Sequence, residues 1–488
     1  MRPNHLLRVT CRWLLAAPVA LAALSAHATV TGISGVGGGT SPRAFEMFVD
    51  EGYISAADGV QIYTWGYGAS TSSGGTGLMQ YSGPTLLVKQ GETVDITLSN
   101  RLPIRTSMMF PGQSGVTACV GTLPCRLAGQ GAAATGVLAG EVAPGSVAAP
   151  TTVTYSFTAS QPGTYLYQSG SQPGLQNEMG LVGALIVYPT GTGVPTAGTT
   201  RWAYNHVGTA FQREALLISS DMDSKIHQAV DERLKAMRSA NDACLASSAG
   251  CLFNVDLAHR FPDYWFLNGR TSPDVFANNN IGEMPHQPYN ALPRLHPGEK
   301  ILLRMVGGGS DLHPMHHHGN NSWAIARDGR MLSSDPILKG PNLAFSDYTI
   351  KVVPGQTYDA IWTWSGAGIG WDIYGKVCGG VGQPTCTSVY TDPRALHQDP
   401  ADRGKAIPVK LPSEFELSYG EFYSGSPYLG DFGIRPVGAG FANTTGAFFH
   451  MFHSHNEREV VNGGVYPGGM MTMLVVEPFS VTIDINQP

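Results

Sequence analysis

His313-Pro314-Met315-His316-His317-His318-Gly319 and His453-Ser454-His455 are the two stretches that decide how this sequence is interpreted. Seven of the 15 histidines lie in the windows 313–318 and 450–455. Successive side chains of an extended strand alternate between two faces, so His316 and His318 share a face, as do His453 and His455. Two such strands side by side would place four imidazoles around one point, which suits copper, zinc, iron or nickel.

The composition favours an extracytoplasmic β protein over other classes. The chain has 488 residues, enough for two or three domains, with only 14% charged residues and 61 glycines. That balance is typical of a loop-rich β protein rather than a helical one. The formal net charge is −6 and no cluster of Lys and Arg stands out, so nucleic-acid binding is not expected.

Residues 1–28 have the pattern of a secretory signal peptide. Three arginines precede the apolar run Trp13–Leu24, and Ala26-His27-Ala28 offers a small-x-small cleavage site. A membrane anchor is the alternative interpretation, but the run is too short to span a bilayer. We therefore predict a periplasmic or secreted protein with no transmembrane segment after the signal is removed.

The cysteines agree with export. Apart from Cys11 they form three local pairs, Cys119/Cys125, Cys244/Cys251 and Cys378/Cys386. Nearest-neighbour disulfides are the simplest of the possible connectivities, and they would require an oxidising compartment. No cysteine lies within a histidine cluster, so a thiolate metal ligand is not expected.

Short apolar strands separated by turn residues make up most of the chain. Thr85–Asn100 shows the pattern, with Val94, Ile96 and Leu98 on one face of a strand. Many such strands predict an all-β fold of Greek-key β-sandwich or barrel domains. In contrast, Asp221–Arg238 has apolar residues at helical spacing and predicts an inserted helix.

A linker rich in Gly, Thr and Pro divides the chain after residue 189. The predicted domains are 45–190 and 196–488, the second with insertions near 220–262 and 376–435. In the alternative division, 376–488 is a third domain. We disfavour it because residues 376–412 offer almost no strand pattern.

The order of these motifs resembles the multicopper oxidase family, which is built from cupredoxin domains. A later domain of that family carries His-Pro-x-His-x-His-Gly, and His313–Gly319 matches it in full. The resemblance extends over nearly the whole mature length through Gly163–Tyr167, Gly183–Val187, Phe266–Arg270, Asp328-Gly329 and Pro354–Asp359. It implies cupredoxin-like domains and copper as the metal. Cu(II) also heads the affinity series of divalent metals, with manganese or iron as alternatives.

The departures from the family lie at its copper ligands. The first-domain histidine motifs are replaced by Met109-Phe110-Pro111-Gly112 and Gln168-Ser169-Gly170. The cysteine of the blue copper site is Ser454, and a later histidine of that region is Glu459. A serine hydroxyl cannot replace the copper–thiolate bond. The resemblance therefore implies a non-blue site, and the family's usual four-electron reduction of oxygen is not expected.

Five histidines remain at the family's ligand positions, and they form the predicted metal site: His313, which matches the blue copper position, and His316, His318, His453 and His455. If the chain stays extended beyond His455, Glu457 and Glu459 share the face of His453 and add carboxylate ligands; salt bridges to Arg458 are an equally good interpretation. Met470 or Met471 offers a soft ligand for Cu(I).

Three functions are compatible with this pattern. The first is an exported, oxidoreductase-like copper protein that acts on metal ions or a small-molecule reductant. The second is a non-catalytic cupredoxin scaffold for protein contacts, because a fold does not by itself guarantee activity. The third is a protein that stores or delivers copper. The sequence also leaves open a protein partner that supplies the missing ligands near Met109 and Gln168.

Overall fold

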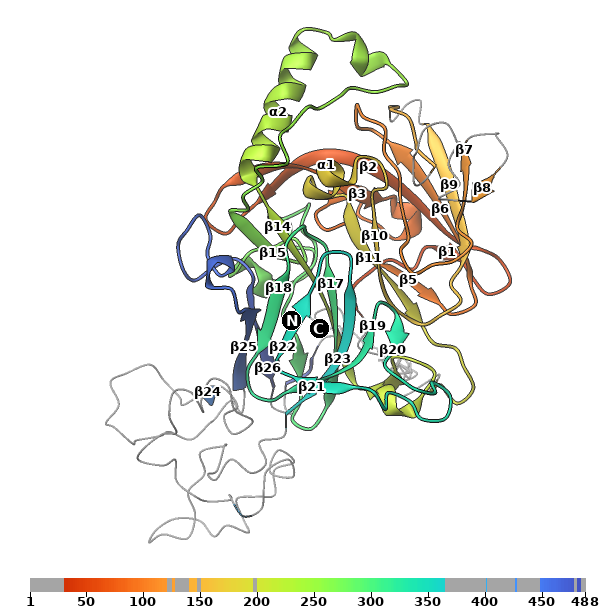
Figure 1. Ribbon diagram of the computed structural model, residues 1–488, viewed down its shortest axis with the longest axis vertical. Helices are drawn as coiled ribbons and strands as arrows, with labels where there is room; N and C mark the ends of the chain where they lie inside the picture. Colours follow the sequence, from red (N-terminus) through yellow and green to blue (C-terminus); the bar gives the residue numbers. More distant parts are fainter. Residues whose placement is uncertain are drawn as a thin grey trace, which may run out of the picture.

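The computed structural model describes residues 30–120, 125–127, 140–146, 151–195, 200–364, 401, 426–427, 448–477 and 481–483. In these residues strands predominate, and four of the sheets form two β-sandwiches (Figure 1). The predicted all-β fold with a helical insertion is confirmed. The segment 1–28, the pair Cys378/Cys386 and most of the insertion 376–435 lie outside the described residues, and the domain boundaries stay a prediction.

The first sandwich packs an eight-stranded sheet against a three-stranded one, with strand orders β4-β3-β2-β6-β9-β7-β8 and β10-β11-β5. Both sheets contribute to one apolar core, for example Ile96 and Tyr155 from the larger and Leu86 and Leu185 from the smaller. The larger sheet contains β1 (Val36–Gly37), which pairs with β2, and β2 (Arg43–Ser55), β3 (Gln61–Ala69), β4 (Met79–Gln80), β6 (Thr93–Asn100), β7 (Thr117–Val120), β8 (Arg126–Leu127) and β9 (Thr152–Thr158). The smaller sheet contains β5 (Leu86–Lys89), β10 (Gly163–Gln168) and β11 (Val182–Tyr188), and the short helix α1 (Pro173–Glu178) connects its last two strands.

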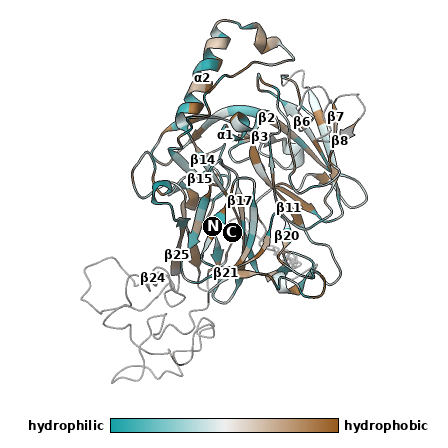
Figure 2. Cartoon of the chain, viewed as in Figure 1, coloured by the Kyte–Doolittle hydropathy of each residue, from teal (hydrophilic) through white to brown (hydrophobic). Residues whose placement is uncertain are grey.

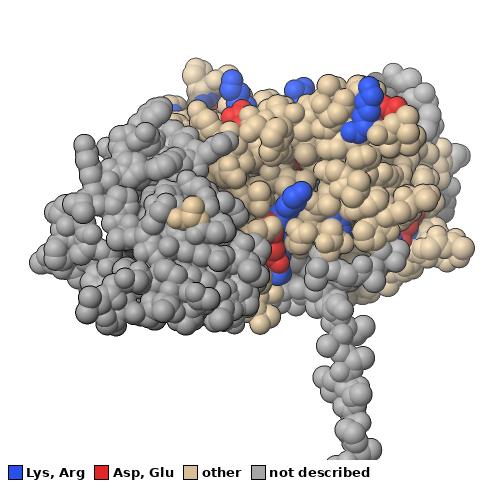
Figure 3. Space-filling model, turned by 90° about the horizontal axis from the view of Figure 1, so that it is seen from below, with Lys and Arg blue, Asp and Glu red and all other residues tan. Residues whose placement is uncertain are grey.

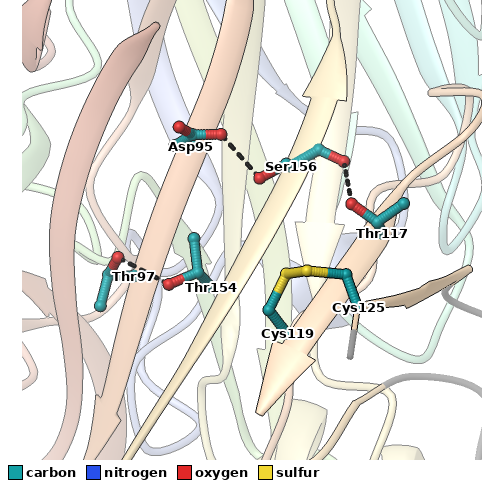
Figure 4. The surroundings of a disulfide bond; sticks show 7 residues. All are labelled: Asp95, Thr97, Thr117, Cys119, Cys125, Thr154 and Ser156. Atoms are coloured by element: carbon teal, nitrogen blue, oxygen red, sulfur yellow. Dashed lines mark hydrogen bonds between the residues drawn. A yellow bond between two sulfur atoms is a disulfide. The ribbon is translucent and has the colours of Figure 1, made fainter. Parts of the chain in front are cut away.

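The predicted alternation along Thr85–Asn100 is confirmed. Val94, Ile96 and Leu98 are fully buried in β6, whereas the residues between them are partly exposed. On the outer face of the same sheet, Ser156 donates to Asp95 at 2.6 Å and the hydroxyls of Thr97 and Thr154 are 3.0 Å apart (Figure 4). Beside them the disulfide Cys119–Cys125 joins β7 to the residue before β8, as predicted.

The second sandwich carries the histidine stretches. Its seven-stranded sheet has the order β15-β14-β17-β23-β19-β20 with β21 on β19, and its six-stranded sheet has the order β16-β26-β25-β18-β22 with β24 on β25. Their shared core includes Leu303 and Trp362 from the first and Met315 and Phe452 from the second. The strands are β14 (Arg213–Met222), β15 (Tyr264–Leu267), β16 (Arg294–Leu295), β17 (Lys300–Gly307), β18 (His313–His317), β19 (Ser322–Arg327), β20 (Arg330–Met331), β21 (Phe345–Asp347), β22 (Thr349–Val352), β23 (Thr357–Thr363), β24 (Ser426–Pro427), β25 (Phe448–Ser454) and β26 (Met471–Val476). A separate ribbon pairs β12 (Arg201–Trp202) with β13 (Ala210–Phe211).

The smaller sheet of the first sandwich packs against the larger sheet of the second. Leu166 and Ile186 from the first pack with Ile218 and Val306 from the second in one apolar cluster. A buried polar bridge lies in the same region, where Thr164 donates to Asp359 at 2.6 Å. This contact fixes the second sandwich, and with it the histidines, relative to the first.

The inserted helix is confirmed as α2 (Ser224–Ser239). Asp223 caps its first turn by accepting a hydrogen bond from the amide of Lys225 at 3.1 Å. Hydrophobic and hydrophilic residues lie on different sides of α2 (Figure 2), and its apolar side joins the core of the first sandwich through Ile226, Val230, Leu234 and Met237. The disulfide Cys244–Cys251 closes the loop that follows, which is the second predicted pairing to be confirmed.

The surface shows no basic patch on the face seen in Figure 3. Lys and Arg of the described residues are scattered there singly or beside acidic groups. No helix in the described ranges is long and apolar enough to cross a membrane. Two short 3-10 helices lie next to strands of the six-stranded sheet. The helix η4 (Asp274–Phe276) contacts β26, and η7 (Glu457–Glu459) directly follows β25.

Candidate metal centre

The two histidine stretches lie on adjacent antiparallel strands. In the register of β18 and β25, His316 is directly opposite His453, and Met315 is opposite Ser454. Since side chains alternate along a strand, His316 and His453 share one face while Met315 and Ser454 share the other. The amide of His318 continues the ladder by donating to the carbonyl of Met451 at 2.9 Å.

Four imidazole rings gather on the first of these faces. The ring of His316 lies at the centre, with centroid distances of 5.0 Å to His318, 5.4 Å to His453 and 4.7 Å to His455. One nitrogen from each of His316, His318 and His453 lies within 4.8 Å of the other two. The predicted convergence of the two stretches is therefore present in the fold, with four of the five predicted ligands together.

Hydrogen bonds orient these rings. Nδ1 of His316 is 2.8 Å from the hydroxyl of Thr349, and Nδ1 of His453 donates to the carbonyl of Ser454 at 2.8 Å. The second contact leaves a lone pair on Nε2 of His453, which faces Nε2 of His318 at 3.4 Å. Nitrogens bound to one metal ion at about 2.0–2.1 Å are roughly 3–4 Å apart, so the spacing of His318 and His453 fits a shared metal ion.

The environment keeps the rings of His316, His318 and His453 neutral. Burial, followed by the neighbouring imidazoles, lowers the pKa of His316 to about 3 and that of His318 to about 4. The pKa of His453 is lowered by burial as well. A neutral imidazole is the form that binds a transition metal.

A pocket of about 520 Å³ opens beside the cluster. It gives three of the four histidines access to small molecules, whereas His316 lies beneath them. Its described lining consists of His318, Met451, His453, Ser454, His455, Glu457, Val460, Val461, Tyr466 and Met471.

His313, the fifth predicted ligand, lies apart from this cluster. Its ring is buried, with Nδ1 at 2.8 Å from Glu459 and Nε2 at 3.1 Å from Asp221. Burial alone would lower the pKa of His313, but the hydrogen bonds to Asp221 and Glu459 raise it to about 9. Both ring nitrogens therefore donate to carboxylates, and the ring is an imidazolium in an ionic network that continues from Asp221 to Arg260.

The expectation that the chain stays extended after His455 is wrong. β25 ends at Ser454, and residues 457–459 form the 3-10 helix η7. This turn buries Glu459 on the opposite face, where it accepts a hydrogen bond from Ser454 at 2.5 Å. Glu457 stays on the pocket side and is exposed. Asn456 has a polar side chain that binds Glu459 at 2.8 Å, which favours the turn over a continued strand.

The remaining histidines of the two stretches face the core. Nε2 of His317 is 2.8 Å from the hydroxyl of Ser322, and the ring of His450 packs between Trp362 and Trp364. Gly319, at a φ of +92°, makes room for His450, because a Cβ there would lie 2.5 Å from Nδ1 of that ring. These contacts position the loop that carries His318.

The positions of the missing first-domain histidines lie next to each other. Met109 and Gln168 form an isolated antiparallel bridge with N–O distances of 2.7 and 3.1 Å. The side chain of Met109 lies over Gly170, where an added Cβ would be 2.7 Å from its Cγ. The fold thus brings together the two stretches at which the resemblance places the first-domain ligands.

Sequence reasoning missed three residues that shape the site: Thr349, Asp221 and Arg260. Thr349 is the first residue of β22, but nothing in its sequence context distinguishes it. Asp221 comes from the end of β14, far from His313 along the chain, and a lone acid before a helix indicates a cap rather than a core partner.

Comparison with solved structures gives matches among copper proteins. The chain is similar to a multicopper oxidase, mgLAC, at 18% identity over 90% of this chain and 87% of the other, with a TM-score of 0.47. A blue copper oxidase from Nitrosomonas europaea matches at 16% identity over 89% and 85%, with a TM-score of 0.47. A copper nitrite reductase from the same organism matches at 16% identity over 66% and 85%, with a TM-score of 0.41.

These matches concern the fold. No protein-family model matches the sequence, and no curated protein matches it closely enough to count as a relative.

Proposed function

We propose that this chain is an exported copper-binding protein with an all-histidine, non-blue centre formed by His316, His318, His453 and His455. It acts as an oxidoreductase on metal ions or small reductants that reach the pocket. The observation that carries this proposal is the approach of one nitrogen from each of three histidines to within 4.8 Å, contributed by two strands far apart in sequence. His313 is not part of the proposed ligand set, because both its nitrogens are engaged with carboxylates.

Copper, when bound, would supply one-electron redox chemistry. The protein's own contribution is to hold the rings in place before binding, through Thr349 on His316 and the Ser454 carbonyl on His453. Burial keeps the imidazoles of His316, His318 and His453 unprotonated, and the pocket admits a small reductant next to His453 and His455. Ser454 cannot supply a thiolate, so electrons would enter directly from the pocket side.

The compartment is part of the proposal. The disulfides Cys119–Cys125 and Cys244–Cys251 favour an oxidising environment. Together with the signal-like residues 1–28 they support export to the periplasm or the medium. The protein would then acquire its metal outside the cytoplasm.

The decisive experiment is elemental analysis and electron paramagnetic resonance of protein purified without added metal. Retained copper with a nitrogen-ligated Cu(II) spectrum, lost in His316→Ala and kept in a variant of the exposed His259, His259→Ala, is the expected result. Oxygen uptake with cuprous, manganous or phenolic reductants then measures turnover. Protein that retains no transition metal, or His316→Ala that retains it fully, would contradict the proposal.

A copper carrier is the second candidate, favoured by the thioethers of Met451 and Met471 in the pocket lining. Such ligands stabilise Cu(I) and suit transfer rather than turnover. A carrier would bind copper and release it to a competing chelator. It would not consume oxygen with the cuprous, manganous or phenolic reductants.

A further inference from the structure

Two methionines stand next to the histidine cluster on the same face of the sheet. Met471 in β26 is directly opposite His453 in β25, and Met451 precedes His453 by two residues on its own strand. Side chains in these relationships point the same way, and directly opposite Cβ atoms are about 4.5–5.5 Å apart. Both methionines line the pocket together with His453.

Met451 and Met471 line the pocket, whereas two neighbouring methionines, Met315 and Met470, do not. Met315 and Met470 are 1% and 0% exposed and belong to the apolar core, where methionine is a common gap filler. Met451 instead is only partly buried and lines the pocket together with the polar groups of His318, His455 and Glu457. Core packing therefore explains the positions of Met315 and Met470 but does not explain the pocket-facing position of Met451.

The side chains on this face change from imidazoles to thioethers across the three neighbouring strands β18, β25 and β26. The imidazoles of β18 and β25 suit Cu(II), whereas thioethers select Cu(I). In the register of the sheet, His316, His453 and Met471 form one row, so His453 lies between the imidazole side and the thioether side. The flexible methionine side chains would allow both sulfurs to reach an ion held at His453.

We propose that Met451, Met471 and His453 form a Cu(I) site on the pocket side of the histidine cluster. The inference rests on the proposed function, because the two sites share His453. The reduced ion would bind at the thioethers and the oxidised ion among the imidazoles, so that the pocket accepts copper in both oxidation states.

The test measures Cu(I) affinity by competition with bicinchoninate under anaerobic conditions, with Ag(I) as a redox-inert probe. The double variant Met451→Leu/Met471→Leu conserves volume, and such exchanges usually cost less than about 1.5 kcal/mol of stability. Its Cu(I) affinity should fall about tenfold or more, which corresponds to ~1.4 kcal/mol, with Cu(II) affinity unchanged. Met470→Leu, the same exchange at the neighbouring core position, should leave both affinities at the wild-type value.

Wild-type Cu(I) and Ag(I) affinity in the double variant would overturn the inference, as would an equal loss of Cu(I) and Cu(II) affinity. Failure of the proposed function is a different result, namely wild-type protein that does not bind Cu(II). In that case the methionine variants still report on the Cu(I) site by themselves, because their readout needs neither Cu(II) nor turnover.

Discussion

Ser454 donates its hydroxyl hydrogen to Glu459 at 2.5 Å, and the same carboxylate oxygen is 2.8 Å from Nδ1 of His313. In the family that the sequence resembles, these three positions hold the cysteine and the two histidines of the blue copper site. Here they hold a serine, a carboxylate and an imidazolium, which bind one another. The fold thus brings these three residues into contact.

This contact predicts that a thiolate site can be rebuilt. The double variant Ser454→Cys/Glu459→His should, with added Cu(II), gain the intense visible absorption of a copper–thiolate bond, because the introduced thiolate would face two imidazoles. Ser454→Cys alone should lack it, since Glu459 still pairs with His313. Absorption and paramagnetic resonance spectra check this, with Ser454→Ala/Glu459→His as the thiol-free control. A double variant that folds and stays colourless would show that the three positions do not converge on a metal.

The central place of His316 predicts a graded loss of metal affinity among the four histidines. Its ring contacts the three others, whereas His455 is exposed and contacts His316 and His453. His316→Ala should therefore weaken Cu(II) binding more than His455→Ala, by about tenfold or more, equivalent to ~1.4 kcal/mol. Isothermal titration with Cu(II) measures both. Equal losses would indicate that the metal lies nearer to the pocket than to His316.

The meeting of the two stretches was predictable from sequence because strand alternation and motif order depend on local pattern. His316, His318, His453 and His455 follow that rule. The position of His313 outside the histidine cluster was not predictable, because it depends on Asp221, which contacts His313 from another sheet. The position of Glu459 was not predicted for a local reason, because the turn after His455 places Glu459 on the opposite face of the sheet. The α2 periodicity predicted a helix, but only the fold shows that it covers the first sandwich.

The buried ion pair of Glu214 and Arg304 predicts a large stability effect. Glu214 accepts hydrogen bonds at 2.9 Å from each of Arg304, Arg201 and Tyr188, and both members of the pair are fully buried. Glu214→Gln would leave the Arg304 guanidinium undercompensated and should lower the free energy of unfolding by about 3–5 kcal/mol. Urea unfolding checks this against Glu232→Gln on the exposed side of α2. A loss no larger than that of the control would mean that the Glu214–Arg304 ion pair is dispensable for stability.

The carboxylate of Glu299 predicts a loss of stability in acid. Burial would raise the pKa of Glu299, but its hydrogen bonds with His296 and Arg213 lower it from 4.5 to about 2. A carboxyl whose pKa is lower in the folded than in the unfolded state stabilises the fold above its unfolded pKa, and that stabilisation is lost as the pH falls. The free energy of unfolding should therefore decline between pH 4.5 and 2 by up to about 3 kcal/mol from this group. Urea unfolding across this window should show a shallower decline in Glu299→Gln than in the wild type, whereas Glu283→Gln, an exposed neighbour, should retain the wild-type slope. Parallel pH profiles for Glu299→Gln and the wild type would show that Glu299 does not cause the loss of stability in acid.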